Sequence, residues 1–256
     1  MKMRWLGTNG FEFVYKGQSV LLDPYLTRSL NEICVPDRVA AHLEHADVVF
    51  VGHSHWDHLA DVPEIARRFG ARVIGSRTTR NICLAMGVSA SQLKEVKAGE
   101  TLQENGFQAT FLTSCHKQPM LYPGTYETVP NAMSRVSDFL EGGTFALLFD
   151  FGGLRVLNLG SANFVPDALA GVVCDYLLLG ISGRAPDFLP KLMRCVTVGV
   201  VVPTHFDFFD TPLEAAGERV SLSTFEREMR EIGWTAEVRI PKPLEWVDWG
   251  GQPACM

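Results

Sequence analysis

The sequence predicts an α/β protein in which two β-sheets pack face to face and helices cover their outer surfaces. Short apolar runs rich in β-branched and aromatic residues, bounded by glycine and proline, alternate with helix signals along the chain. A weak internal repeat relates the two halves. With 46% hydrophobic and 20% charged residues among 256, the chain can bury a substantial core. Because no linker or low-complexity tract divides it, we expect a single domain over residues 1–256.

The N-terminal third is expected to begin with an antiparallel meander. The runs MRWLG, FEFVY and SVLLDP are strand-like, and a KGQ turn separates the last two. A polar, helix-like stretch from Asp37 to Ala46 leads to the apolar run from Asp47 to Gly52, which suits a strand buried on both faces. A buried strand is therefore predicted to end just before His53.

Helices and strands are expected to alternate after that point. Asp61, Pro63 and Glu64 form a helix-start signal in which the Asp61 carboxylate is the N-cap. We expect this helix to run through Ile65 to Phe69 and to stop at Gly70. Further elements are predicted as a strand in ARVIGS, a helix near Arg77 to Met86, and strands near Glu95 to Lys97 and Phe107 to Thr113.

The internal repeat predicts that the two halves of the chain fold alike. FEFVYKGQSVLLDP resembles FALLFDFGGLRVLNLGS, since each reads as apolar strand, glycine turn, apolar strand and polar tip. VVFVGHSHWDH then corresponds to DYLLLGISGR, and ARVIGS to VGVVVPTHFD, which places His205 at the end of a strand. The segment from Lys117 to Gly143 between the halves has few strand signals, and loops of this length are often functional.

The C-terminal part is expected to add one helix and one apolar strand-like segment. Ser221 to Ile232 has the pattern of an amphipathic helix. Val238 to Trp249 is apolar and strand-like, and we expect Trp246 and Trp249 to lie in the core.

Charge and composition exclude several classes of function. The 23 basic and 29 acidic residues give a net charge of −6 and no basic stripe, so nucleic acid is not an expected partner. No run approaches the roughly 18 apolar residues of a membrane span, and the start MKMRWLG lacks the apolar core of a signal peptide, so a cytoplasmic protein is expected. The sequence is compatible with a homo-oligomer. The six cysteines form no CxxC pair and are expected to be reduced thiols.

Three of the seven histidines fall in the six-residue motif His53-Ser-His-Trp-Asp-His58. Histidines two residues apart in an extended segment point the same way, whereas Asp57 and His58, after the chain turns, face a different point nearby. One short loop can therefore supply ligands to two metal positions.

A third ligand must come from elsewhere, because a catalytic zinc takes three protein ligands and keeps one place for water. His116 follows a predicted strand and is the natural candidate to join the first two histidines of the motif. The second position would take Asp57 and His58, with His205 as the well-placed remaining histidine. His42 and His45 lie in a polar, helix-like stretch and are expected to be solvated.

The order of HxHxDH, a later lone histidine, an acidic tip and a final histidine resembles the metallo-β-lactamase fold superfamily over nearly the whole chain. The resemblance implies a four-layer αββα sandwich with the site along one edge between the sheets. It carries His53, His55 and His116 to one metal and Asp57, His58 and His205 to the other. Three segments most resemble the branch that contains ascorbate-6-phosphate lactonase and N-acylphosphatidylethanolamine phospholipase-like hydrolases: Gly7 to Phe13, Leu22-Asp23-Pro24 and Pro203-Thr-His205.

One position departs from the superfamily pattern. Where most relatives have an aspartate that bridges both metals, the tip Asn158-Leu-Gly-Ser161 has serine. A neutral hydroxyl is a poor bridging ligand, so we expect Ser161 to weaken one metal position. The cofactor is predicted as one or two zinc ions, with manganese and iron left open by the ligand types.

The expected activity is metal-dependent hydrolysis of a small-molecule ester, lactone, amide or phosphoester. Bound zinc lowers the pKa of water to about 7 and so generates hydroxide at neutral pH. Asp57 would be catalytic, because it would bind a metal, orient the hydroxide by a hydrogen bond and pass a proton to the leaving group. Tyr122 and Tyr126 are expected to form part of the pocket. The alternatives are a phosphodiesterase or nuclease, and a non-catalytic binding protein with a degenerate site.

Overall fold

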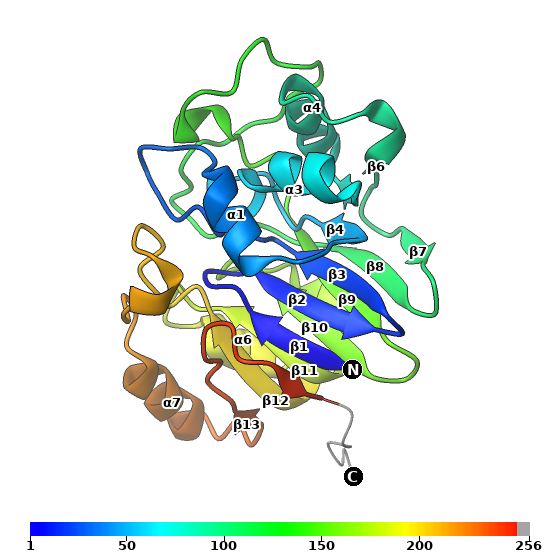
Figure 1. Ribbon diagram of the computed structural model, residues 1–256. Helices are drawn as coiled ribbons and strands as arrows, with labels where there is room; N and C mark the ends of the chain where they lie inside the picture. The colour runs from blue at the N-terminus through cyan, green and yellow to red at the C-terminus, as the bar shows by residue number, and fades with distance from the viewer. Residues whose placement is uncertain (250–256) are drawn as a thin grey trace.

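The computed structural model describes residues 1–249, in which two sheets of seven strands each lie face to face (Figure 1). The predicted α/β class is confirmed. The first sheet has the order β14-β1-β2-β3-β4-β5-β6. Its strands are β1 (Lys2–Trp5), β2 (Phe11–Tyr15), β3 (Gln18–Leu22), β4 (Val48–Phe50), β5 (Arg72–Gly75), β6 (Leu93–Glu95) and β14 (Val247–Asp248).

The second sheet has the mirrored order β13-β12-β11-β10-β9-β8-β7. Its strands are β7 (Thr101–Gln103), β8 (Gln108–Thr113), β9 (Phe145–Asp150), β10 (Arg155–Leu159), β11 (Val172–Gly180), β12 (Val196–Thr204) and β13 (Glu237–Val238).

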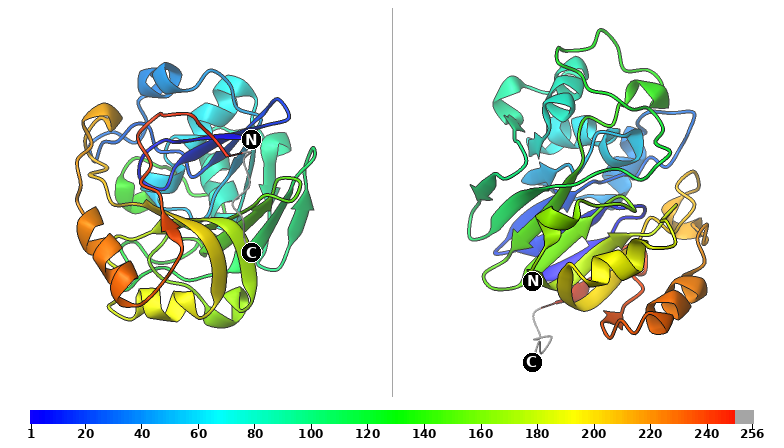
Figure 2. Two further views of the ribbon diagram at one scale, coloured as in Figure 1. Left: turned by 90° about the horizontal axis from the view of Figure 1, so that it is seen from below. Right: turned by 180° about the vertical axis from the view of Figure 1, so that it is seen from behind.

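Helices cover the outer face of each sheet, which gives the four layers that the family resemblance implies (Figure 2). Helices α1, α3 and α4 cover the first sheet, and α6 and α7 cover the second. The α-helices are α1 (Pro36–His42), α2 (Trp56–Leu59), α3 (Val62–Phe69), α4 (Arg77–Ala85), α5 (Pro166–Leu169), α6 (Phe188–Met193) and α7 (Leu222–Glu231). Short 3-10 helices are η1 (Ala90–Gln92), η2 (Val136–Asp138) and η3 (Leu213–Ala215).

The internal repeat corresponds to a repeated sheet topology. In the first half, β2 and β3 pair antiparallel, and β4 and β5 then add in parallel. In the second half, β9 and β10 pair antiparallel, and β11 and β12 add in parallel. The predicted meander of β1, β2 and β3 is also present. Because corresponding strands end on the same side of the two sheets, their following loops meet at one edge.

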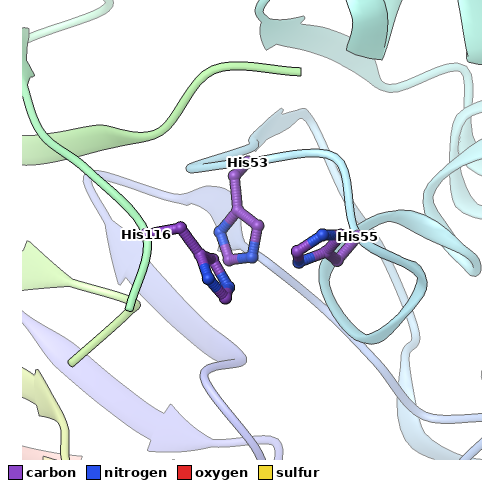
Figure 3. Close-up of side chains that lie close together, drawn as sticks. All are labelled: His53, His55 and His116. Atoms are coloured by element: carbon purple, nitrogen blue, oxygen red, sulfur yellow. The ribbon is translucent and has the colours of Figure 1, made fainter. Parts of the chain in front are cut away.

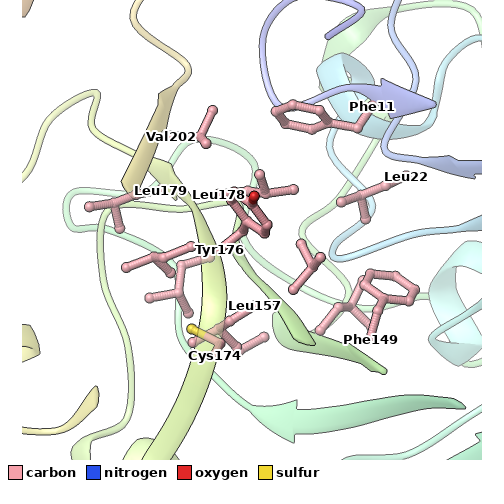
Figure 4. Packing of buried hydrophobic residues seen from close by; sticks show 14 of the residues in the cluster. Phe11, Leu22, Phe149, Leu157, Cys174, Tyr176, Leu178, Leu179 and Val202 are labelled. Carbon is pink, nitrogen blue, oxygen red and sulfur yellow. The ribbon is translucent and has the colours of Figure 1, made fainter. Parts of the chain in front are cut away.

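An aromatic core holds the sheets together and fixes the position of that edge. Phe149 of β9 is fully buried, and its ring lies 5.1 Å from the ring of Phe50 of β4, in the opposite sheet. Figure 4 shows buried side chains of both sheets in this layer, among them Phe11 and Leu22 of the first sheet and Leu157 and Leu178 of the second. Each such buried side chain contributes roughly 1.5–3 kcal/mol of transfer free energy, so the relative placement of the sheets is well determined.

Helix α3 begins and ends as predicted, but the predicted role of Asp61 is wrong. Asp61 occupies the N-cap position and Gly70 ends the helix with a left-handed φ of 71°. The Asp61 carboxylate does not cap the helix; it accepts hydrogen bonds from the backbone N–H groups of Leu26 and Thr27 at 2.6 and 2.7 Å. The Asp61 carboxylate therefore bonds the N–H groups of a buried loop, which need acceptors, and not the N–H groups at the start of its own helix.

The C-terminal segment differs most from expectation. In place of one strand over 238–249, it forms two-residue strands on different sheets: β13 pairs with β12, and β14 pairs with β1. Trp249 is buried as predicted. The prediction for Trp246 is wrong, because its side chain is 42% exposed and the Arg4 guanidinium lies 4.7 Å from the centre of its ring. Near the N-terminus, α1 ends at His42, four residues before the expected limit.

The remaining structural expectations concern membranes and cysteines. No helix in the described part of the chain has both the length and the apolar character needed to cross a membrane. The five cysteines within residues 1–249 form no disulfide, whereas Cys255 lies outside the described residues.

Candidate metal centre

The HxHxDH motif begins three residues after β4 and changes conformation in its middle. His55 has an extended backbone (φ −62°, ψ 155°), and the one-turn helix α2 starts at Trp56. His53 and His55 therefore lie on the extended part, while Asp57 and His58 lie on the helical turn. This is the change of direction that the sequence predicts, and it divides the motif between two neighbouring groups of donors.

The first group consists of His53, His55 and His116. Each offers one ring nitrogen, and these nitrogens lie within 4.8 Å of one another. The ring centres are 4.7 to 5.0 Å apart, and Figure 3 shows the three imidazoles converging on a common point. His116 follows β8 of the second sheet, so the group joins loops from both sheets at one edge.

The second group consists of Asp57, His58 and His205, whose donor atoms also lie within 4.8 Å of one another. His205 follows β12, and its Nε2 is 3.1 Å from Asp57 Oδ2. The ring of His58 is centred 3.8 Å from the ring of His53, which makes the two groups immediate neighbours. The structure thus brings together all six side chains that the sequence analysis selected.

The conformation of His205 is held by a contact between distant parts of the chain. Its φ is 55°, which is uncommon for a residue other than glycine. Its backbone N–H donates to the carbonyl of Thr8 at 2.8 Å. This hydrogen bond fixes a strained backbone at the point where the histidine must reach the second group.

Burial sets the protonation of the first group. It lowers the pKa of His53 and of His55, and it lowers the pKa of His116 to about 4. The three imidazoles are therefore neutral at neutral pH, which is the form that binds a metal. Burial alone would raise the pKa of Asp57, but His58 and His205 outweigh it and hold the pKa well below its usual value.

Hydrogen bonds outside the two groups orient their ring nitrogens. His116 Nδ1 lies 3.0 Å from the carbonyl oxygen of Lys117, so Nδ1 donates and Nε2 keeps its lone pair. The Nε2 atom of His55 is buried without a hydrogen-bond partner in the described structure. A buried nitrogen without a partner is costly, and a cation would satisfy it. Five imidazoles and one carboxylate are a donor set that suits zinc and similar transition metals.

Asp23 is a residue of this site that the sequence analysis named only as part of a family pattern. It follows β3 and is fully buried, and its Oδ2 lies 2.9 Å from His58 Nδ1. It also accepts hydrogen bonds from the Gly52 backbone at 2.7 Å and from Asn9 Nδ2 at 2.9 Å. The contact between Asp23 and His58 Nδ1 leaves His58 Nε2 facing the other two side chains of the second group. Burial would lower the pKa of His58, but Asp23 and Asp57 raise it.

We predict that Asp23→Asn weakens zinc binding at the second group by about 10- to 100-fold, the usual cost of losing a partner behind a ligating histidine. Binding at the three-histidine group should change less than threefold. Calorimetric titration of zinc into the metal-depleted protein would resolve the two events. Asp150→Asn, at the end of β9, is the matched control. Equal weakening of both events by Asp23→Asn would contradict this role.

Ser161 lies beside histidines of both donor groups. It lines a small hollow together with His116 and His205, which belong to different groups. Its Oγ accepts a hydrogen bond from the backbone N–H of Lys117 at 3.0 Å. The Ser161 hydroxyl therefore has a hydrogen-bond partner within the protein.

A pocket opens above the donor atoms, and its walls differ in part from those predicted. Tyr122 and Tyr126 are not among its lining residues; Tyr122 packs behind Trp56, with ring centres 5.8 Å apart. The segment Lys117 to Gly143 contributes Leu121 instead. The full lining comprises His55, Trp56, Asp57, His116, Lys117, Leu121, Ser182, His205, Phe209 and Arg219. Arg219 had no sequence signal, because it reaches the pocket through the irregular loop after His205.

Two other histidines lie apart from the centre. The expectation that both are solvated is correct for His45 and wrong for His42, whose side chain is 15% exposed. His45 is exposed beside Asp47, with a separation of 3.0 Å, and His42 lies 3.3 Å from Glu214. Neither lines the pocket.

Comparison with known proteins supplies independent information. A family model described as a beta-lactamase superfamily domain matches residues 18–207. A UPF0173 metal-dependent hydrolase of Methanopyrus kandleri is 28% identical over 248 residues, which are 96% of this chain and 98% of that protein. Another, of Archaeoglobus fulgidus, is 26% identical and covers 96% and 97% of the two chains. The structure is similar to Igni18, a metallo hydrolase of Ignicoccus hospitalis, with a TM-score of 0.65, 20% identity and coverage of 96% and 97%.

Proposed function

Because the chain belongs to the beta-lactamase superfamily and has the metallo-β-lactamase fold, we propose that it is a metal-dependent hydrolase acting at the six-residue centre on a small ester, lactone, amide or phosphoester. The names of the UPF0173 relatives agree with hydrolysis and specify no substrate. The observation that carries the proposal is the adjacency of two donor groups at the floor of an open pocket.

His53, His55 and His116 would hold one cation, and Asp57, His58 and His205 a second. Zinc or manganese bound there would lower the pKa of water and polarise the oxygen of the bond to be cleaved. We propose zinc or manganese as the metal, with one or two ions bound. Ser161 is expected to make the second cation the weaker one.

Asp57 has the position and charge of a group that handles a proton. It lines the pocket, and its depressed pKa keeps the carboxylate charged. Its oxygens can accept a hydrogen bond from the attacking water, which directs a water lone pair towards the substrate. The same carboxylate can then carry the released proton to the leaving group. Around it, Trp56, Leu121 and Phe209 form apolar walls of the pocket.

Within the superfamily, we propose the branch of ascorbate-6-phosphate lactonase and N-acylphosphatidylethanolamine phospholipase-like hydrolases. Two of the segments that resemble this branch reach the centre. Asp23, in Leu22-Asp23-Pro24, contacts His58, and Pro203-Thr-His205 ends with a member of the second group. A phosphorylated lactone and an N-acyl phospholipid are therefore informative substrates to include in a screen.

The test is chelation followed by reconstitution. Activity on a panel of esters, lactones, amides and phosphoesters should disappear after treatment with a chelator and return with zinc or manganese. Hydrolysis that persists in the metal-free protein would overturn the proposal. Cleavage of single-stranded RNA in place of these substrates would favour the nuclease alternative.

The pKa directions predict that the two groups lose metal at different pH values. His58 has a raised pKa, so it takes up a proton at a higher pH than an ordinary imidazole does, and its zinc affinity should drop by about tenfold per unit below that pKa. The pKa values of His53, His55 and His116 are lowered, so the first group should retain zinc to a lower pH than the second group does. Zinc content after dialysis between pH 8 and pH 4.5 would fall from two to one. Simultaneous loss of both ions would refute this prediction.

A further inference from the structure

Two cationic side chains, Lys117 and Arg219, line the pocket above the histidines. Neither has an ion-pair partner among residues 1–249. Asp57 is the carboxylate in the pocket lining, and its Oδ2 already faces His205. The chain as a whole is acidic, with a net charge of −6, so this pair of uncompensated cations is a local feature of the pocket.

The position of Lys117 is fixed by its surroundings. Its backbone N–H donates to Ser161 Oγ at 3.0 Å, and its carbonyl lies 3.0 Å from His116 Nδ1. Its half-buried side chain lies against Gly183, where an added Cβ would come within 2.9 Å of Lys117 Nζ. The glycine, whose φ is 74°, leaves room for the lysine stem beside the backbone. The ammonium therefore lies against the backbone at Gly183, beside the pocket.

Three hollows meet at this side chain. The first is the pocket above the histidines, and the second is the small hollow at Ser161. The third is lined by Phe164 and by Phe188 of α6. Lys117 lines all three, so a substrate that extends from the centre into any of them passes within reach of its ammonium.

Arg219 adds a second cation on the side of His205. Its guanidinium lies 5.2 Å from the centre of the Phe209 ring, and that ring lies 5.5 Å from the ring of His205. Stacking on an aromatic ring restricts the guanidinium while leaving its N–H donors available.

We propose that Lys117, assisted by Arg219, binds an anionic substituent of the substrate, a carboxylate or a phosphate, that is separate from the bond to be cleaved. The inference rests on the proposed hydrolysis and narrows its substrate class to anionic esters, lactones or amides. Beside apolar walls, an ammonium that meets a substrate anion forms a charge-assisted hydrogen bond stronger than it could form with a neutral group. The cations thereby select anionic substrates and orient them over the donor groups.

The first test compares two esters of equal acyl length on the zinc-loaded protein, neutral 4-nitrophenyl butyrate and anionic 4-nitrophenyl hemisuccinate. Lys117→Met should lower kcat/KM for the hemisuccinate by about 10-fold or more, the value of one charge-assisted hydrogen bond, and change that for the butyrate less than about twofold. Lys117→Arg should keep most of the preference. Lys94→Met, an exposed lysine on β6, is the matched control and should change neither rate. Equal losses for both esters would overturn the inference.

A second measurement separates failure of this inference from failure of the proposed hydrolysis. Calorimetry with glutarate and with inorganic phosphate, again on the zinc-loaded protein, reports anion binding without turnover, and the two probes distinguish carboxylate from phosphate. Lys117→Met should weaken binding of the preferred anion by about 10-fold at unchanged zinc content. If neither ester is hydrolysed but this weakening is seen, ester hydrolysis fails and the anion site stands. Unchanged anion affinity in Lys117→Met overturns the anion site, whether or not the esters are hydrolysed.

Discussion

Replacing His55 by alanine is expected to abolish hydrolysis and zinc binding at the three-histidine group. His55 is buried, its Nε2 has no other partner in the described structure, and its ring lies 4.7 Å from that of His116. Losing a partner that only orients a ligand costs 10- to 100-fold, so losing the ligand itself should cost more than about 100-fold in both zinc affinity and kcat/KM. Zinc content by elemental analysis and rates on the best substrate of the panel would measure the two effects.

The matched control for this prediction is His45→Ala. His45 is exposed beside Asp47 and lies outside the donor groups, so its loss should leave zinc content and activity within twofold of the wild type. Circular dichroism would establish that both variants are folded. If His55→Ala retained full activity, the assignment of the centre would be wrong.

The second large effect is expected from Arg28→Met, which should lower the free energy of unfolding by about 3–5 kcal/mol. Arg28 and Asp207 form a fully buried ion pair at 2.8 Å, and Arg28 also donates to the backbone carbonyls of Phe208 and Thr211. Without the guanidinium, the Asp207 carboxylate stays buried, and among residues 1–249 only the backbone N–H of Thr8, at 3.1 Å, remains bonded to it. Denaturant-induced unfolding followed by fluorescence would give the free energy.

A double variant tests whether the lost stability comes from the unpaired buried charge of Asp207. Arg28→Met combined with Asp207→Leu removes both charges and should recover part of the lost stability. Arg227→Met removes an exposed arginine of α7 whose partner is Glu231, and should cost less than about 1 kcal/mol. A cost below 1 kcal/mol for Arg28→Met alone would show that the pair does not stabilise the segment that carries His205.

Local patterns in the sequence were sufficient to predict most of the two sheets and to select the six side chains that the structure brings together. The repeat predicted two similar halves because each contains the same antiparallel and then parallel pairing. The motif predicted two donor groups because an extended segment followed by a helical turn changes the direction of side chains within six residues. These features depend on backbone periodicity and on residue chemistry, which one sequence contains.

Features that depend on distant contacts could not be predicted in the same way. Asp61 has the local signature of a helix cap, yet its carboxylate bonds the loop at Leu26 and Thr27, because that loop passes over the helix only in the folded chain. Asp23 reaches His58 because β3 and β4 are neighbours in the sheet. Arg219 enters the pocket through an irregular loop, where no periodic pattern indicates a direction for the side chain.

The central claim is that six side chains from three distant parts of the chain hold one or two cations at one edge of the sandwich. Anomalous diffraction at the zinc absorption edge, from crystals of the zinc-loaded protein, tests it most directly. We predict a strong peak among His53, His55 and His116, and a second, weaker peak among Asp57, His58 and His205. No anomalous peak within bonding distance of the three-histidine group would contradict the account.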